Sequence, residues 1–402
     1  MCYRFILVTL LLMGICWSSS GGVLNSENPP QPKKHVLRWL NPNKAGINGK
    51  KLALVDTIMC KAVRDSAFPG AVLLVAKDGM IVHHKAYGHL EYGANVEKVD
   101  TNTIFDIASL TKVIATTNAC MRLIDERKLR LKDRVVKYLP DFGKNGKSKI
   151  TIQNLLLHNS GLPAWKPFYR NCHDPKCLLD SIFALPLVAA TGDSTIYSDF
   201  GFIVLGKIIE KVCATTLDRY VDSVFFRPLG MWTTMYNPPA NLISRIAPTE
   251  IDTLREKSGK AIRGQVHDEN AAILGGVSGH AGLFSTASDL AIILEMIRNG
   301  GEYGGKRFIR KATVEQFIHR QSQKSTRALG WDTKKPQRSW AGELLSNKAF
   351  IHAGFTGTSV VVDPHCGVII VLLTNRVFPT RENEKIAEVR PKVHDGILGA
   401  LK

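Results

Sequence analysis

The chain has 402 residues, more than one hydrophobic core usually supports, so we expect either one unit with two lobes or two domains. Hydrophobic residues make up 45% and charged residues 22%, which are ordinary proportions for a globular protein, and there is no repeat of fixed period. The net charge is +18, but no dense basic run carries interleaved aromatic residues. Nucleic acid is therefore not an expected partner, whereas weak attraction to anionic surfaces stays open.

Residues 1–20 have the features of a secretory signal peptide. Arg4 gives a positive start, residues 5–16 are apolar, and small residues follow. The apolar run is short for a membrane span, and no other stretch is apolar for long enough, so we expect no span in the mature chain. The prediction is a secreted protein, with tethering by an uncleaved signal anchor as the alternative. Residues 21–49 are expected to form a linker or N-terminal extension, and residues 50–402 the functional domain.

Of the eight cysteines, Cys2 and Cys16 lie within residues 1–20 and would leave with the signal peptide. Cys172 and Cys177 flank a loop that contains proline, and in an oxidising compartment they can close a small disulfide. A metal site formed by these two and His173 lacks a fourth ligand nearby and is not favoured. The other four lie in or beside apolar segments and are predicted to be buried thiols: Cys60, Cys120, Cys213 and Cys366.

The first half of the chain begins with a helix and a hairpin. Apolar residues at helical spacing predict a helix over residues 51–66. Residues 70–88 read as two strands joined at an Asp-Gly turn, Asp78-Gly79. A helix is expected from about Ser109 to Asp125, and the region 115–320 is mostly helical in pattern, broken by glycine and proline loops.

Strands return near the C-terminus. Residues 327–333, 350–364 and 367–376 are rich in apolar and β-branched side chains, and the last two segments form a hairpin around residues 364–366. A final helix is expected over residues 384–401. Strands at both ends with helices between them predict an α+β fold, in which both chain ends build one antiparallel sheet with flanking helices. The middle then forms an inserted, mostly helical lobe, and a cleft between the two parts is a favoured place for an active site.

Ser109 and Lys112 lie three residues apart and share one face of the expected helix. A serine hydroxyl becomes a strong nucleophile when a neighbouring base takes its proton, and a neutral lysine can be that base. Burial and nearby positive charge would lower the pKa of Lys112 and favour its neutral form. At a helix start, the N–H of Ser109 can also be half of an oxyanion hole. The pair alone is weak support, because an N-capping serine and a solvated lysine give the same pattern.

Two later segments supply possible companions for this pair. Tyr197, in YSD just before a helical pattern, can relay a proton, although a half-buried tyrosine beside a capping Ser-Asp pair fits equally well. His352 lies in an expected strand and is followed by small residues, so a substrate can approach the strand edge. The N–H of Phe355 can be the second oxyanion donor, whereas a strand with a glycine bulge at Gly354 explains the same residues without chemistry.

With these three motifs in order, the sequence resembles the serine β-lactamase and penicillin-binding-protein-like hydrolases. That family includes class C β-lactamases, D-alanyl-D-alanine carboxypeptidases and related esterases. Its motifs are S-x-x-K, Y-x-N or a variant, and K-T-G or H-x-G. Further segments look like family segments and together span about residues 50–400: FPGAVLLVAKDG, TIFDIASLTKVIATT, ITIQNLLLHNSGLP, RPLGMWTT, HDENAAILGGVSGHAGLFSTASDLA and HAGFTGTSVVVDP.

The resemblance implies a β-lactamase/transpeptidase-like fold and a serine hydrolase that works through an acyl-enzyme on Ser109. Lys112 would be the general base, Tyr197 would assist proton transfer, and His352 would orient the substrate at the first position of the third motif. The oxyanion hole would be formed by the backbone of Ser109 and Phe355, with Gly354 and Asp199 as further substrate-binding positions. No cofactor or metal is implied. The expected substrates are small esters or short peptides, and the oligomeric state is not predicted.

Two residues depart from the family pattern. Asp199 stands where class C β-lactamases carry asparagine, and a carboxylate that only accepts hydrogen bonds cannot donate to a substrate carbonyl, although it can hold Lys112 by charge. His352 replaces lysine, so positive charge there would be weaker and pH-dependent, with activity expected to fall below about pH 6.5. Both changes argue against efficient β-lactam hydrolysis. An idle family member that serves in binding or assembly is the alternative reading.

Four other polar residues are assigned lesser roles. His158 and His280 are expected to be structural, because an isolated histidine is more often satisfied within the fold than used in chemistry. His267 and Asp268 are candidates for lining the cleft from the helical lobe.

Overall fold

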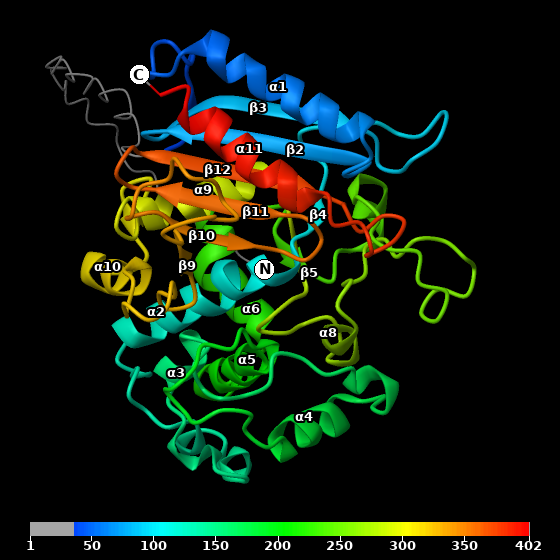
Figure 1. Ribbon diagram of the computed structural model, residues 1–402. Helices are drawn as coiled ribbons and strands as arrows, with labels where there is room; N and C mark the ends of the chain where they lie inside the picture. The colour runs from blue at the N-terminus through cyan, green and yellow to red at the C-terminus, as the bar shows by residue number, and fades with distance from the viewer. Residues whose placement is uncertain (1–35, 402) are drawn as a thin grey trace, which may run out of the picture. The chain divides into compact units, whose positions relative to one another are not determined.

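Strands from both ends of the chain meet in one seven-stranded sheet in the computed structural model, which describes residues 36–401 (Figure 1). The strand order is β1-β3-β2-β12-β11-β10-β9, and all neighbours are antiparallel except β1 and β3. The prediction that both chain ends share one sheet is confirmed. The bounds are β1 Arg38–Trp39, β2 Gly70–Lys77, β3 Met80–Gly88, β9 Asp332–Thr333, β10 Phe350–Ala353, β11 Ser359–Asp363 and β12 Val368–Thr374.

The middle strands of this sheet are covered on both faces. Alternate residues of β2 and β12 point to opposite sides, so Leu73 and Leu372 pack on one face while Val72 and Val371 pack on the other. The first face lies under the helices α1 (Gly49–Arg64) and α11 (Ile386–Leu398), as Figure 1 shows. The second face lies against α9 (Ala287–Arg298). Burial on both sides explains why these strands read as nearly continuous apolar runs.

Helix α1 forms for the reasons that the sequence indicates. Its buried residues recur at helical spacing and give one apolar stripe for the sheet, namely Leu52, Val55, Met59 and Ala62. The side chain of Asn48 accepts a hydrogen bond from the N–H of Lys51 and caps the first turn.

The chain between β3 and β9 forms the helical lobe and a small second sheet, β4-β6-β5, that supports it. The strands of that sheet are β4 Phe105–Asp106, β5 Met235–Tyr236 and β6 Leu283–Ser285. A separate hairpin is formed by β7 Glu302–Tyr303 and β8 Lys306–Arg307. The remaining helices are α2 Thr117–Asp125, α3 Ile152–Leu156, α4 Pro175–Ala184, α5 Asp199–Cys213, α6 Leu217–Val221, α7 Arg227–Leu229, α8 Glu269–Ile273 and α10 Lys311–Ile318.

Two predicted elements are broken in the structure. The helix expected from Ser109 to Asp125 is a 3₁₀ turn (Ala108–Leu110), then a π-helical turn (Lys112–Thr116), then α2. Such a π turn changes the direction of the side chains along the helix and is common at functional sites. The strand expected over residues 350–364 is interrupted by a turn at Gly354–Thr358, so that β10 and β11 form a hairpin of their own.

The folded body begins before the boundary expected at residue 50. Strand β1 pairs with β3, and Ile47 is fully buried and bridges to Leu401 near the other end of the chain. These residues therefore pack into the domain and are not a free linker. The predicted signal peptide lies outside the described residues. No helix among residues 36–401 is long and apolar enough to cross a membrane.

The cysteines follow most of the expectation. Cys172 and Cys177 form the predicted disulfide, which excludes them as metal ligands. Cys120 is a buried free thiol, and Cys213 and Cys366 are half-buried. The prediction was wrong for Cys60, which is exposed because it lies on the outer side of α1, away from the apolar stripe.

The central strand β12 offers a test of the packing. Leu372→Ala removes a fully buried side chain beneath α1 and α11, and we expect it to lower the free energy of unfolding by about 2–5 kcal/mol, because transfer and cavity costs add. The matched control Leu54→Ala alters a side chain that is 63% exposed, and its effect should stay within about 0.5 kcal/mol. Urea unfolding followed by circular dichroism measures both. Equal effects would contradict this packing.

Candidate active site

Ser109 lies in a strained turn at the end of β4. The residue before it, Ala108, has φ +46°, a left-handed conformation that alanine rarely adopts. The turn is held by Asp106, whose Oδ1 accepts the N–H of Ala108 at 2.8 Å, and by β6, where the carbonyl of Leu283 accepts the N–H of Ile107 at 3.0 Å. The surrounding structure thus fixes the position of the serine, whose side chain stays half-buried at a cavity wall.

Lys112 is fully buried and its ammonium group is surrounded by acceptors. Nζ donates to Ser109 Oγ at 2.8 Å and to the carbonyl of His280 at 3.2 Å, and it pairs with Asp199 at 2.7 Å. The predicted contact between nucleophile and lysine is therefore present. Asp199 is the first residue of helix α5, so the helical lobe supplies the counter-charge for Lys112.

The protonation state of Lys112 differs from the expectation. Burial is the largest single influence and disfavours the charge, but the carboxylate of Asp199 and the hydroxyl of Tyr197 together outweigh it and raise the pKa above the usual lysine value. The prediction of a lysine neutralised by burial is wrong for this state, because Asp199 stands within ion-pair distance. Lys112 is an ammonium at neutral pH.

Tyr197 immediately precedes the N-cap of α5 and packs over Lys112. The lysine Nζ lies 4.9 Å from the centre of the tyrosine ring. The guanidinium of Arg327 lies 5.1 Å from the same ring. The ring of Tyr197 therefore has two cationic side chains close to it, and its role in proton transfer stays a prediction.

His352 lies on β10 and is only 3% exposed. The centres of the His352 and Tyr197 rings are 6.1 Å apart. Its Nδ1 donates to the carbonyl of Ala353 at 3.0 Å, so the unprotonated nitrogen is Nε2. Burial, followed by the charges of Lys112 and Arg327, holds the pKa of His352 well below its usual value. The expected charge change near pH 6.5 is therefore wrong, and His352 is a neutral acceptor throughout the physiological range.

The turn after β10 lies directly against the nucleophile turn. A Cβ atom on Gly354 would lie 2.5 Å from the carbonyl oxygen of Ile107, so only glycine allows this approach. Thr356 and Thr358 donate through their hydroxyl groups to the carbonyls of Asp106 and Ile107, at 2.7 and 3.1 Å. Two independent turns are joined in this way, which brings Phe355 beside Ser109.

The backbone N–H groups of Ser109 and Phe355 are available for a ligand. Neither has a hydrogen-bond acceptor in the part of the chain that the structure describes. Both residues line the same two cavities, and the side chain of Phe355 is 50% exposed at their rim. This is the arrangement that an oxyanion hole requires.

Two cavities meet at Ser109, Tyr197 and Phe355. One has a volume of about 340 Å³ and is rich in arginine, and its lining includes His352 with Arg327, Arg376 and Arg390. The other has a volume of about 370 Å³ and is acidic and aromatic, and its lining includes Trp165, Asp199, Asp268 and Glu269. The predicted positions of His267 and Asp268 along the cleft are confirmed.

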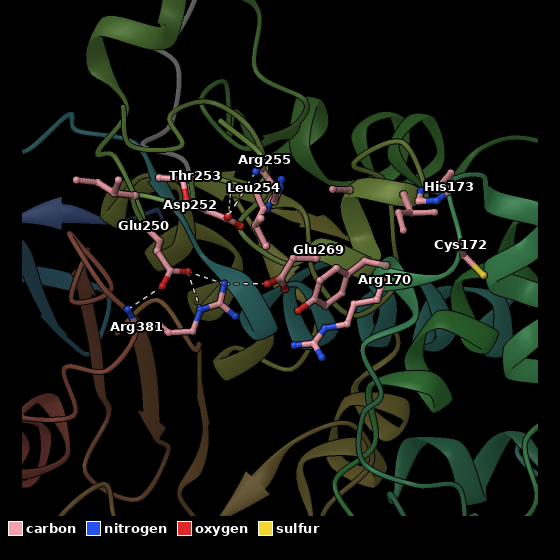
Figure 2. A pocket seen from close by; sticks show the side chains of 14 residues that line it. Arg170, Cys172, His173, Glu250, Asp252, Thr253, Leu254, Arg255, Glu269 and Arg381 are labelled. Atoms are coloured by element: carbon pink, nitrogen blue, oxygen red, sulfur yellow. Dashed lines mark hydrogen bonds and ion pairs between the residues drawn. The ribbon is translucent and has the colours of Figure 1, made fainter. Parts of the chain in front are cut away.

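A larger cavity of about 870 Å³ adjoins the acidic one and shares Glu269 and Arg381 with it. Figure 2 shows Arg381 between two carboxylates, with ion pairs of 2.5 Å to Glu250 and 2.8 Å to Glu269. His267 bonds to the same Glu250 at 3.0 Å, and its ring stacks on that of Phe355 at 5.7 Å. Burial opposes the charge on Glu250, but His267 and Arg381 hold its pKa at about 2.

Asp199, Asp268 and His280 have ligand atoms within 4.8 Å of one another, which is close enough to hold a metal ion. Their ligand atoms are already engaged in other interactions. Asp199 pairs with the ammonium of Lys112, and His280 Nε2 bonds to Asp268 at 2.9 Å. A cation placed here would have to face that ammonium, so the group fits a proton network better than a metal.

His158 and His280, which were expected to be structural, contact the residues of the site without lining either cavity. His158 is buried, and its Nδ1 accepts the N–H of Ser198 at 3.0 Å. Its ring packs on Tyr197 with the ring centres 4.4 Å apart, while His280 offers its carbonyl to Lys112. Both act on the position of reactive groups without facing the cavity.

Sequence reasoning did not single out Asp106, Arg327, Arg376, Arg381 or Arg390. The first four lie in loops or at strand ends, and no spacing rule links any of the five to Ser109. Arg390 lies in α11, whose sequence reads only as a terminal amphipathic helix. A signal did exist in one case: FDIAS places Asp106 three residues before the serine, as a capping aspartate would be placed.

The Lys112–Asp199 pair can be tested by titration. In Asp199→Asn the main influence that raises the lysine pKa is gone while burial remains, so we expect the pKa of Lys112 to move to lower pH. Nitrogen-15 NMR of the lysine Nζ measures this directly. The exposed Asp180→Asn on α4 serves as the control and should leave the titration unchanged. An unaltered Lys112 pKa in Asp199→Asn would rule out Asp199 as its counter-ion.

Known proteins match over most of the chain. The sequence profile of the Beta-lactamase family matches residues 55–394. A protein of Escherichia coli (strain K12), provisionally named a D-alanyl-D-alanine carboxypeptidase, is 36% identical over 378 residues, which span 86% of each chain. A Salmonella typhi protein of the same name is 35% identical over 385 residues, which span 87% of this chain and 88% of the relative.

Solved structures agree on the fold. EstCE1, described as a hydrolase with promiscuous acyltransferase activity, superposes with a TM-score of 0.70 at 23% identity, covering 87% of this chain and 99% of that chain. A class C β-lactamase superposes with a TM-score of 0.71 at 20% identity, covering 88% and 97%. The fold is thus the β-lactamase/transpeptidase-like fold that the sequence implies. The chain belongs to the Beta-lactamase family of serine hydrolases.

Proposed function

We propose that this protein is an acyl-transfer hydrolase in which Ser109 attacks the carbonyl of a small ester or short peptide and forms an acyl-enzyme. The observation that carries the proposal is the 2.8 Å hydrogen bond between Lys112 Nζ and Ser109 Oγ in a buried site. A surface lysine with a capping serine would have given neither the burial nor the ion pair with Asp199. Tyr197 packs on the same Nζ and completes a set suited to moving protons.

The first step needs an acceptor for the serine proton. Lys112 is an ammonium in the resting site, so it must release one proton before its Nζ can accept the proton of Ser109 Oγ. The reactive form therefore grows as pH rises toward the raised pKa of Lys112. The oxyanion that develops on the substrate accepts the N–H groups of Ser109 and Phe355, which are rigidly held and need little reorganisation.

The leaving group then needs a proton, and Tyr197 lies between Lys112 and the cavity to supply it. Water attacks the acyl-enzyme in the second step, and the proton transfers run in reverse. His352 contributes a neutral acceptor beside the substrate. Asp199 holds Lys112 in place and contributes no donor toward a substrate carbonyl.

The cavities favour small substrates. Volumes of about 340 and 370 Å³ on the two sides of Ser109 leave room for a modest acyl group and a modest leaving group. Ester and peptide bonds suit this arrangement better than β-lactams. Class C β-lactamases carry an asparagine, which can donate a hydrogen bond, at the position of Asp199, and a cationic lysine at the position of His352. Asp199 cannot donate, and neutral His352 supplies no positive charge. The provisional name of the relatives, D-alanyl-D-alanine carboxypeptidase, supports the peptide class, and the description of EstCE1 as a hydrolase with acyltransferase activity supports acyl-transfer chemistry.

A fluorophosphonate probe tests the nucleophile. We expect the wild-type protein and the exposed loop variant Ser258→Ala to be labelled, and Ser109→Ala to lose labelling, because only an activated serine displaces fluoride at a useful rate. A screen of p-nitrophenyl esters, nitrocefin and D-amino peptides against the same variants then defines the substrate. Labelling that persists in Ser109→Ala would remove Ser109 from the mechanism. A folded wild-type protein inert to every reagent would favour the binding or assembly role.

We also propose that the chain is exported. The positive start, short apolar run and small residues within 1–22 support this, and so does the disulfide between Cys172 and Cys177, a bond typical of oxidising compartments. Expression in a secreting cell should release protein whose N-terminus begins near residue 21, as N-terminal sequencing shows. Membrane-bound protein that retains residue 1 would instead indicate the signal anchor.

A further inference from the structure

The proposed second oxyanion donor belongs to the peptide group between Gly354 and Phe355. The buried Arg376 and the half-buried Arg390 hold the carbonyl groups of Phe355 and Gly354. Arg390 Nη2 donates to the carbonyl of Gly354 at 3.1 Å and to that of Thr358 at 3.0 Å. Arg376 Nε donates to the carbonyl of Phe355 at 2.8 Å, and its guanidinium lies 4.5 Å from the centre of the Phe355 ring. The arginines reach the turn from the chain after β12, Arg390 from helix α11.

The geometry of a peptide bond links the carbonyl to the donor. The bond between Gly354 and Phe355 is trans, since the only cis bond among residues 36–401 joins Phe378 to Pro379. In a trans peptide the C=O and N–H point in opposite directions within one plane. Fixing the carbonyl of Gly354 on Arg390 therefore directs the N–H of Phe355 away from that arginine. Ser109 and Phe355 both line the acidic cavity, whereas Arg390 does not.

Neither arginine is explained by charge pairing. No carboxylate lies within ion-pair distance of Arg376 or Arg390 in the described residues, and the Nε of Arg390 has no hydrogen-bond partner there. Burial, and then the charge of Arg376, lowers the pKa of Arg390 to about 10. A cation largely removed from water without a counter-charge is expensive, and a hydrophobic side chain would fill the space at lower cost. Arg376 also donates through Nη1 to the carbonyls of Arg381 and Asn383, both at 2.7 Å, and the guanidinium of Arg390 lies 5.8 Å from the centre of the Trp340 ring. The hydrogen bonds that Arg390 donates go to the backbone of the turn.

We propose that Arg390, with Arg376, is a positioning residue that orients and polarises the Gly354–Phe355 peptide, so that the N–H of Phe355 is a strong oxyanion donor. A guanidinium on the carbonyl draws electron density from the peptide nitrogen and strengthens the N–H as a donor, in the way that hydrogen bonds in a chain reinforce one another. The inference rests on the proposed function, because it assigns a role within the oxyanion hole of Ser109.

The experiment compares variants on a neutral ester. With p-nitrophenyl acetate, which has no anion for an arginine to bind, Arg390→Met should lower kcat about 10- to 100-fold and change KM less than about 2-fold, because a misaligned oxyanion donor weakens only the transition state. The matched control Lys392→Met removes an exposed cation two residues along α11 and should leave both constants unchanged. Arg390→Ala should regain activity when guanidinium ion is added at millimolar concentration.

Other outcomes have definite readings. Wild-type labelling by the fluorophosphonate with no loss in Ser109→Ala refutes the proposed function, whereas unchanged kcat in a folded Arg390→Met refutes this inference alone. A loss confined to a carboxylate-bearing ester, with raised KM, would show that Arg390 binds substrate directly and would overturn it. If Arg390→Met does not fold, Arg390→Lys serves instead, because it keeps the positive charge. In the amide NMR spectrum of Arg390→Lys the signal of the Phe355 N–H should shift relative to wild type. An unshifted signal contradicts the proposal.

Discussion

The ion pair between Lys112 and Asp199 is the interaction on which the reaction centre depends. An ammonium taken wholly out of water is tolerated only when a counter-charge and further acceptors surround it, and Asp199, Ser109 and the carbonyl of His280 meet that need. Because Lys112 follows the nucleophile and Asp199 begins α5, this one pair holds the sheet side of the site against the helical lobe. The same carboxylate keeps the lysine protonated, so structural support and reactivity are coupled through a single charge.

Close backbone packing sets the rest of the geometry. Gly354 lets the turn after β10 touch the turn before Ser109, and Thr356 and Thr358 tie the two together through the carbonyls of residues 106 and 107. Strain is concentrated at Ala108, whose left-handed backbone persists because Asp106 and β6 hold both sides of it. The proposed reaction uses two backbone N–H groups and needs this rigidity, since a donor that must reorient on each turnover stabilises the oxyanion less.

Histidine in place of lysine at position 352 gives the cleft a different electrostatic character. The neutral ring of His352 supplies no charge, and the cations beside Tyr197 in the resting site are Lys112 and Arg327 instead. Ser109 therefore lies between an arginine-rich cavity and an acidic one. The acidic side continues into the cavity around Arg381, where Glu250 joins that arginine to His267 and, by stacking, to Phe355 (Figure 2).

The sequence by itself determined the sheet from both chain ends, the α1 stripe and the β2–β3 hairpin, because periodicity and turn residues are properties of neighbouring residues. The three motifs around Ser109 were recognised as a set through the resemblance to the family. Tertiary structure alone decided how the protons are held. Whether Lys112 is charged depends on the distance to Asp199, and whether His352 is neutral depends on burial beside two cations, and no local pattern contains either quantity. The placement of the arginines that hold the Phe355 turn was likewise fixed by packing between segments far apart in the chain.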